Sequence, residues 1–87
     1  LIIALSTKYN IKLMDVLQEL QEKLSKRHET LKKYRKVMIA IQRSGTDQLT
    51  YNRAVSGTGP VGVPTMQRIA IAQLAVINEY EQELANV

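Results

Sequence analysis

The chain has 87 residues, a formal net charge of +4 at pH 7, a single histidine, and no cysteine, phenylalanine or tryptophan. A chain of this size buries only about 60% of the surface that its unfolded form exposes, so its own core is thin. The lack of cysteine excludes disulfides, and one histidine excludes the usual zinc sites, which leaves partner subunits as the support for the fold.

The first residues carry neither a helix cap nor enough apolar length to cross a membrane. Residues 1–9 hold a short β-like apolar run, and we expect them to form an N-terminal arm. No apolar run approaches the roughly 20 residues that span a bilayer, and the run from Leu1 to Leu5 is too short for the core of a secretory signal. The sequence therefore predicts a soluble, intracellular protein that does not contact a membrane.

A seven-residue repeat of leucine marks the first predicted helix, over residues 10–43. Asn10 is a suitable N-cap, and Ser44-Gly45 ends the helix because glycine readily adopts the left-handed conformation found at helix ends. Apolar residues at steps of three and four form a narrow seam that other helices must cover. Arg27 interrupts the seam, and we expect it either to extend outward or to fix the register and the partner. The predicted packing residues of this helix are Leu13, Leu17, Leu20, Leu24, Leu31, Tyr34, Met38 and Ile41.

Positive charge is concentrated in the second half of this helix. From Lys23 to Arg43, the basic residues accompany a single acidic residue, Glu29. The cations are either the solvated face of a coiled coil or a surface that neutralises nucleic-acid phosphates. The first interpretation is favoured, since no base-reading motif accompanies the charges. The residues available to nucleic acid in the second interpretation are Lys26, Arg27, Lys32, Lys33, Arg35 and Lys36.

The segment over residues 44–64 contains all four glycines and both prolines. Residues 48–52 alternate polar and β-favouring side chains, which predicts a short strand. Either this strand pairs with residues 61–63 in a β-hairpin, or the segment contacts another protein. The candidates for that partner contact are Leu49, Tyr51 and Arg53.

The second predicted helix covers residues 65–86, with Thr65 as its N-cap and Pro64 preventing an earlier start. We expect the two helices to form an antiparallel hairpin, in which the longer first helix overhangs the second and leaves part of its seam for a neighbour. One end of the subunit should then be acidic and the other basic. The predicted packing residues of the second helix are Ile69, Leu74, Ile77 and Leu84, and its acidic residues are Glu79, Glu81 and Glu83.

No pattern in the sequence predicts catalysis, a metal or a cofactor. His28 has no second histidine, and no serine or aspartate at a diagnostic spacing, so it is expected to be a surface or packing residue. The three C-terminal glutamates are two residues apart on a helix, so successive side chains diverge by about 200° and cannot converge on one ion. The Ser-Gly-Thr-Gly-Pro segment at residues 56–60 lacks the lysine of a phosphate loop. A non-enzymatic protein is expected.

Three motifs in the second half of the chain carry a resemblance to a known family. They are Ile39-Ala40-Ile41-Gln42 with Gly45, then Gln48-Leu49-Thr50-Tyr51-Asn52, and then Val63-Pro64-Thr65 opening a helix that ends Glu79-Tyr80-Glu81-Gln82-Glu83-Leu84. Over residues 38–86 the chain resembles the small head-completion, or head-tail joining, proteins of tailed bacteriophages. The resemblance implies a helix, β-hairpin, helix module that forms a ring beneath the portal, in the virion or the host cytoplasm.

The sequence therefore predicts one small, mostly α domain over residues 1–87, with a short β-hairpin or extended loop between two helices. The expected function is that of a structural subunit in a homo-oligomer, most specifically a ring at a phage head-tail junction. Portal or tail proteins are then its partners, and DNA lies close by. The alternative is a basic coiled coil that binds nucleic acid.

Overall fold

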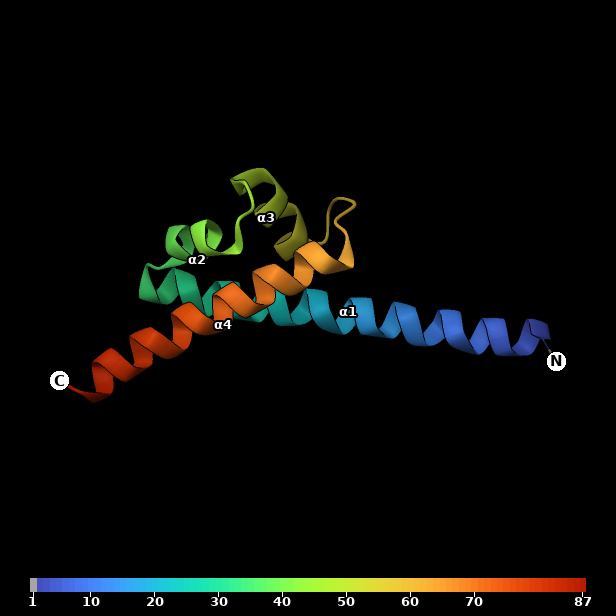
Figure 1. Cartoon of the computed structure of the whole chain (residues 1–87), viewed down its shortest axis with the longest axis horizontal. Helices are drawn as coiled ribbons and strands as arrows, with labels where there is room; N and C mark the ends of the chain where they lie inside the picture. Colours follow the sequence, from blue (N-terminus) through green and yellow to red (C-terminus); the bar gives the residue numbers. More distant parts are fainter. Residues whose placement is uncertain (1) are drawn as a thin grey trace.

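Four helices make up the part of the chain that the structure describes (Figure 1). The computed structural model describes the backbone of residues 2–87 and the side chains from residue 15 onward. The helices are α1 (Ile2–Tyr34), α2 (Val37–Ser44), α3 (Gln48–Ser56) and α4 (Val63–Ala85), and residues 2–87 contain no strand. The prediction of a mostly α fold is confirmed, whereas the β-hairpin is not found in these residues.

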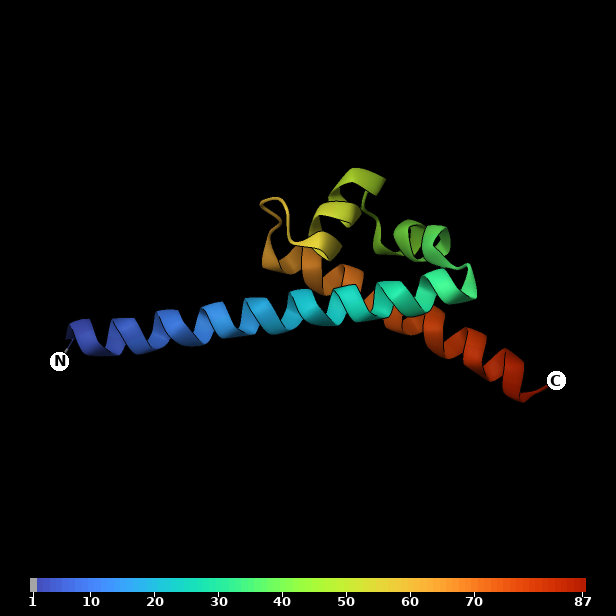
Figure 2. The ribbon, with the colours of Figure 1, turned by 180° about the vertical axis from the view of Figure 1, so that it is seen from behind.

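The two long helices, α1 and α4, run in the same direction, as Figure 1 and the reverse view in Figure 2 show. Gln73 of α4 hydrogen-bonds the Leu24 carbonyl of α1, and further along both helices Tyr34 bonds Glu81. The expected antiparallel pairing of the two long helices is therefore wrong. The reason is that the intervening segment, which contains α2 and α3, returns the chain to a point beside the middle of α1 before α4 begins.

The helix antiparallel to α1 is α3. Gln21 Nε2 donates to the Val55 carbonyl at 2.7 Å, while further along α1 the His28 ring meets the Tyr51 hydroxyl, which lies earlier in α3. The antiparallel helix pair of this fold therefore consists of α1 and α3, and α4 packs along both of them.

The chain reverses at Arg35 and Lys36, which break the helix expected over residues 10–43. Arg35 adopts a left-handed φ of 58°. Its N–H donates to the Lys32 carbonyl at 3.1 Å, and the Lys36 N–H donates to the Leu31 carbonyl at 2.9 Å. These two bonds satisfy the last carbonyls of α1 in a motif that usually places glycine at the left-handed position. The break was not foreseen because arginine seldom adopts a positive φ.

For the helix predicted over residues 10–43, the structure differs from the prediction at the start and agrees with it at the end. α1 begins at Ile2, so the N-terminal arm predicted over residues 1–9 is helical from Ile2 onward, and Asn10 lies inside the helix instead of capping it. The predicted end is confirmed: α2 finishes at Ser44, and Gly45 has a left-handed φ of 71°.

Residues 48–52 belong to helix α3, and the predicted strand is wrong. The Asp47 carboxylate accepts a hydrogen bond from the Thr50 N–H at 3.0 Å, and Gly57 ends the helix with φ 71°. Apolar side chains spaced three and four residues apart are buried on one face of this helix, and this burial outweighs the β preference of the alternating residues. The buried residues of α3 are Tyr51, Ala54 and Val55.

α4 begins two residues before the predicted start. Its N-cap is Gly62, whose carbonyl accepts the Met66 N–H at 3.1 Å, and Thr65 lies inside the first turn. Pro64 does not prevent this start, because the first amides of a helix have no acceptor within it and proline lacks only an amide that is free anyway.

All four helices contribute to the core, and α1 extends well beyond it. The first half of α1 projects past the other helices in Figure 1. The chain measures 59 × 27 × 18 Å, and its radius of gyration is 15.5 Å, against about 12 Å for a compact domain of this length. The buried core residues around α3 are Leu24, Ile41, Tyr51, Ala54, Val55, Met66, Ile69 and Ala70, and a second cluster comprises Leu31, Ala40, Val76 and Ile77.

We expect Arg35→Gly to raise the free energy of unfolding by about 0.5–1 kcal/mol. The left-handed conformation costs a residue with a side chain roughly 1–2 kcal/mol, and the greater freedom of glycine in the unfolded chain offsets part of that gain. Thermal denaturation followed by circular dichroism measures the change. Lys33→Gly is the control, because Lys33 is exposed within α1 and glycine there should destabilise by about 1 kcal/mol. Equal destabilisation by both variants would contradict the account of the break.

Candidate interaction surface

The structure divides the predicted packing residues between the core and the surface. The seam is covered best in the second half of α1, and its cover decreases toward the start of that helix. The buried members are Leu24, Leu31, Ile41, Ile69 and Ile77; Leu17, Leu20 and Tyr34 are half-buried; Met38, Leu74 and Leu84 are exposed. The Leu13 side chain lies outside the described residues. Much of the leucine repeat therefore serves the core of the chain itself, and only its first part remains for a neighbour.

Arg27, the polar residue in the seam, joins α1 to α4. Its Nη1 atom donates to the Ala70 carbonyl at 2.8 Å. This bond holds the guanidinium across the boundary between the two helices and lays the apolar stem of the side chain along it. Arg27 thus helps to position the long helices of one chain, and its predicted role in choosing a partner stays a prediction.

An open groove with partly apolar walls follows the boundary between α1 and α4. It is lined by Leu20, Lys23 and Arg27 from α1 and by Gln67, Ala70, Ile71 and Leu74 from α4. Ile71 is 69% exposed, and Val16, which is 54% exposed, lies one turn before Leu20 on α1. Val16 and Ile71 are not among the packing residues predicted from the sequence. The steps of four, three and four residues through Val16, Leu20, Lys23 and Arg27 were the signal for this stripe, which the leucine repeat concealed.

The three candidates for a partner contact in the middle segment do not act together. Tyr51 is fully buried, whereas Leu49 is 57% exposed and Arg53 is also exposed. The Arg53 side chain lies close to the backbone of Gly59, where a Cβ atom would come within 2.7 Å of the Arg53 Cδ. Of the three, Tyr51 belongs to the core, and Leu49 and Arg53 reach the surface.

Tyr51 is the centre of a buried polar network that joins α1, α3 and α4. Gln73, also fully buried, donates through Nε2 to the Tyr51 hydroxyl at 3.1 Å and to the Leu24 carbonyl at 3.1 Å. The Tyr51 oxygen lies 3.0 Å from His28 Nδ1, and the tautomer of the imidazole decides which of the two groups donates. Burial raises the pKa of Tyr51, so its hydroxyl stays protonated. Gln73 Oε1 has no hydrogen-bond partner among the described atoms.

We expect Tyr51→Phe to lower the free energy of unfolding by about 1–3 kcal/mol, because Gln73 Nε2 then loses an acceptor while staying buried. Tyr34→Phe is the matched control, since the Tyr34 hydroxyl meets Glu81 at the surface and at 3.4 Å. Urea denaturation of both variants measures the difference. Equal effects would show that the buried hydroxyl contributes no more than the surface one.

We also expect stability to fall as the pH is lowered toward 5. Partial burial lowers the pKa of His28 below 6.5, nearby Lys32 acts in the same direction, and Glu29 opposes both. The unfolded chain therefore takes up this proton at a higher pH than the folded chain does. Stability should be constant above about pH 7.5, decline as the pH falls through 6.5, and level off below the folded pKa. Denaturation midpoints of the wild type and of His28→Gln between about pH 8 and 5 test this, since only the wild type should lose stability across the window.

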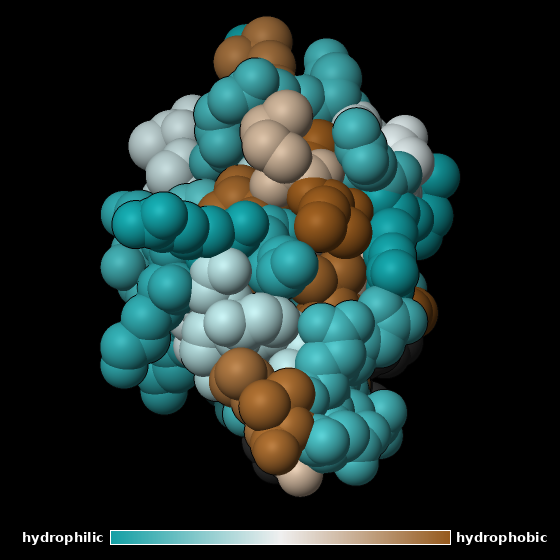
Figure 3. Space-filling model, turned by 90° about the vertical axis from the view of Figure 1, so that its left-hand side faces the viewer, coloured by the Kyte–Doolittle hydropathy of each residue, from teal (hydrophilic) through white to brown (hydrophobic). Residues whose placement is uncertain are grey.

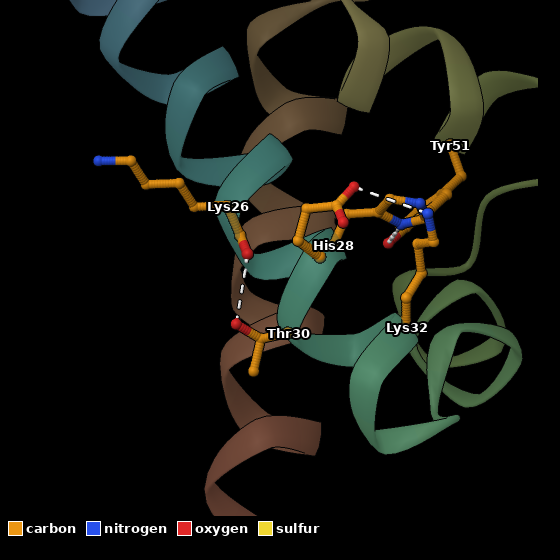
Figure 4. Close-up of polar contacts among 6 residues, drawn as sticks. Lys26, His28, Thr30, Lys32 and Tyr51 are labelled. Atoms are coloured by element: carbon orange, nitrogen blue, oxygen red, sulfur yellow. Dashed lines mark hydrogen bonds and ion pairs between the residues drawn. The ribbon is translucent and has the colours of Figure 1, made fainter.

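The cations considered for nucleic-acid binding do not share one face. In Figure 4 the Lys26 side chain points away from His28 and Tyr51, whereas Lys32 extends on their side of α1. The hollow lined by Glu29, Thr30, Lys32 and Lys33 is formed by α1 alone, so it has no opposing wall.

Several of these cations are already engaged within the chain. Lys32 Nζ lies 3.7 Å from Glu29, and the Lys36 ammonium lies 5.4 Å from the centre of the Tyr80 ring. With Arg27 bonded to Ala70, the remaining candidates are Lys26, Lys33 and Arg35, which are exposed. The structure therefore does not gather the six residues into one basic patch.

The two poles of charge expected for an antiparallel hairpin are not formed. Because α4 runs alongside α1 in the same direction, its acidic end lies beside the basic end of α1 and beside α2. Glu79 of α4 is paired with Arg43 of α2 at 2.6 Å, and Glu81 meets Tyr34. Opposite charges thus meet at this end, and no ion pair among the described side chains joins Asp15, Glu19 or Glu22 to α4.

Other exposed apolar residues are dispersed. Figure 3, which views the end where α4 terminates, shows hydrophobic residues in separate groups among hydrophilic ones. The exposed apolar residues of α2 and α4 outside the groove include Met38, Ile39 and Leu84. No helix in the described part of the chain is long and apolar enough to cross a membrane, and the described side chains contain no cluster of acidic residues and histidine suited to a metal ion. Comparison with protein-family models, curated proteins and solved structures gave no match to this chain.

Proposed function

We propose that this chain is a non-enzymatic structural subunit that acts by associating with copies of itself. The observation that carries the proposal is the groove between α1 and α4, which continues onto the exposed stripe of α1 at Val16. Ile71 and Leu74 expose apolar side chains, and a neighbour that covers them removes this surface from water, which favours association. A subunit whose longest helix extends beyond its own core has a rigid element to offer to such a neighbour.

The size of the core supports the same proposal. An isolated chain of this length has little apolar surface to bury, and α1 runs beyond the helices that could cover it (Figure 2). Association would bury the outer part of α1 and add stability that grows with the logarithm of the protein concentration.

The narrower proposal is a ring protein at the head-tail junction of a tailed phage, which works in the virion beside portal or tail proteins. It rests on the resemblance of residues 38–86 alone. The β-hairpin that the resemblance implied is replaced by α3, so the remaining support comes from the helical segments on either side. Rings visible by electron microscopy of the purified chain are the observation that this narrower proposal requires.

Nucleic-acid binding is the alternative, through the exposed Lys26, Lys33 and Arg35. The separation of the cations over different faces of α1 favours self-association over this alternative. Salt distinguishes the two, because phosphate binding weakens steeply as ionic strength rises and apolar helix packing does not.

We expect the purified chain to be oligomeric, with a mass that increases with concentration. Sedimentation velocity over a hundredfold range of concentration, at low and at high salt, measures this, and a parallel series with a short duplex DNA tests the alternative. A chain that stays monomeric throughout and unfolds at high temperature would contradict the proposal. Salt-sensitive co-sedimentation of that monomer with DNA would instead support the alternative.

A further inference from the structure

We propose that two copies of this chain pair through α1, antiparallel to each other, about a two-fold axis beside the junction of Glu22 and Lys23. This inference rests on the proposed self-association and specifies its surface and geometry. The occupant of the α1/α4 groove is then the equivalent stripe of a second copy, and each copy receives the same contact that it gives.

The apolar part of the contact comes from the stripe of α1 and the adjoining wall of α4. Val16 and Leu20 lie on the same face of α1 as Lys23 and Arg27, whose bond to Ala70 keeps the guanidinium against α4. An antiparallel neighbour centred between residues 22 and 23 places its own Val16 beside the Arg27 end of this stripe. The exposed Ile71 and Leu74 stand beside it on α4 and would be covered at the same time.

The order of charges on α1 selects a second copy as the occupant. Three acidic residues precede three basic ones across the junction, in the order Asp15, Glu19, Glu22 and then Lys23, Lys26, Arg27. Among the described side chains, no ion pair joins these residues to one another. A surface that changes sign at its midpoint is complementary to its own copy when the copy is turned around.

The helix geometry places the opposite charges at the same level in this pair. With the axis between residues 22 and 23, Glu19 of one copy is level with Lys26 of the other, and Glu22 is level with Lys23, since both members of each pair are equally far from the axis. At 100° per residue, Glu19, Glu22 and Lys26 lie on one flank of α1. An antiparallel two-fold pair brings this flank against the same flank of the second copy. A parallel pair would bring acid against acid and base against base.

Charge reversal in two complementary variants tests the pairing. One variant carries Glu19→Lys with Glu22→Lys, and the other carries Lys23→Glu with Lys26→Glu. Each variant alone places four like charges on each copy of the contact, so we expect its dissociation constant to rise at least tenfold above that of the wild type. A one-to-one mixture restores opposite charges at every level, and we expect it to form a mixed dimer at the wild-type concentration. Native mass spectrometry identifies that dimer, because the two variants differ in mass.

Two further variants test the apolar half of the contact. Ile71→Asp should weaken association at least tenfold, whereas Leu49→Asp, at a similarly exposed apolar residue on α3, should not. Circular dichroism shows that each variant keeps the helix content of the wild type.

The outcomes separate this inference from the proposed function. A monomeric wild type overturns both. An oligomeric wild type whose mass is unchanged by the charge reversals, or whose two variants fail to combine when mixed, overturns the antiparallel pair and leaves self-association in place. Equal weakening by Ile71→Asp and Leu49→Asp likewise overturns the assignment of the groove.

Discussion

The reversal of the chain at Arg35 and Lys36 is the constraint on which the rest of the fold depends. One residue in the left-handed conformation converts what the leucine repeat presents as a continuous helix into α1 and α2, and the turn pairs the Leu31 and Lys32 carbonyls at the end of α1. Because the chain turns there, α3 packs antiparallel to α1, and α4 begins again beside the middle of α1. A straight helix to Ser44 would have carried the residues of α2 away from α4 and left the second core cluster unformed.

The parallel course of α1 and α4 has an electrostatic cost that the sequence offsets locally. Both helices end at the same side of the molecule, where the negative ends of their dipoles approach each other. Lys32 and Lys33 lie in the last turn of α1, but the last turn of α4 contains no basic residue. Arg43, at the end of α2, brings a positive charge to the C-terminal half of α4, where it pairs with the Glu79 carboxylate. In an antiparallel hairpin that turns after Arg43, these two residues would lie toward opposite ends, so this ion pair suits the observed topology better than the expected one.

Periodicity foretold which residues are buried better than it foretold where helices begin and end. Leu24, Leu31, Ile69 and Ile77 were selected by spacing alone and are buried, because a helical stripe must be covered whatever the topology. The break at Arg35 could not be foreseen, since nothing in its side chain favours a positive φ and only the packing of α2 against α4 rewards it. The strand at residues 48–52 was a different kind of error. Asp47 and Gly57 bracket a nine-residue helix, and these local end signals should have outweighed the alternation between them.

The proposed antiparallel pair bears directly on what larger assembly this chain can build. A two-fold contact uses the same surface on both copies and is closed, so by itself it ends at two subunits. A ring with more members needs a second contact that is not consumed by the first. The exposed apolar residues outside the groove include Met38 and Ile39 on α2 and Leu84 on α4, which lie on helices other than α1 and remain free in the pair. They are dispersed and interrupted by polar side chains, which suits a weaker contact formed only after the pair provides two copies of each patch. On this view the α1 pair is the stable unit, and any ring is assembled from pairs.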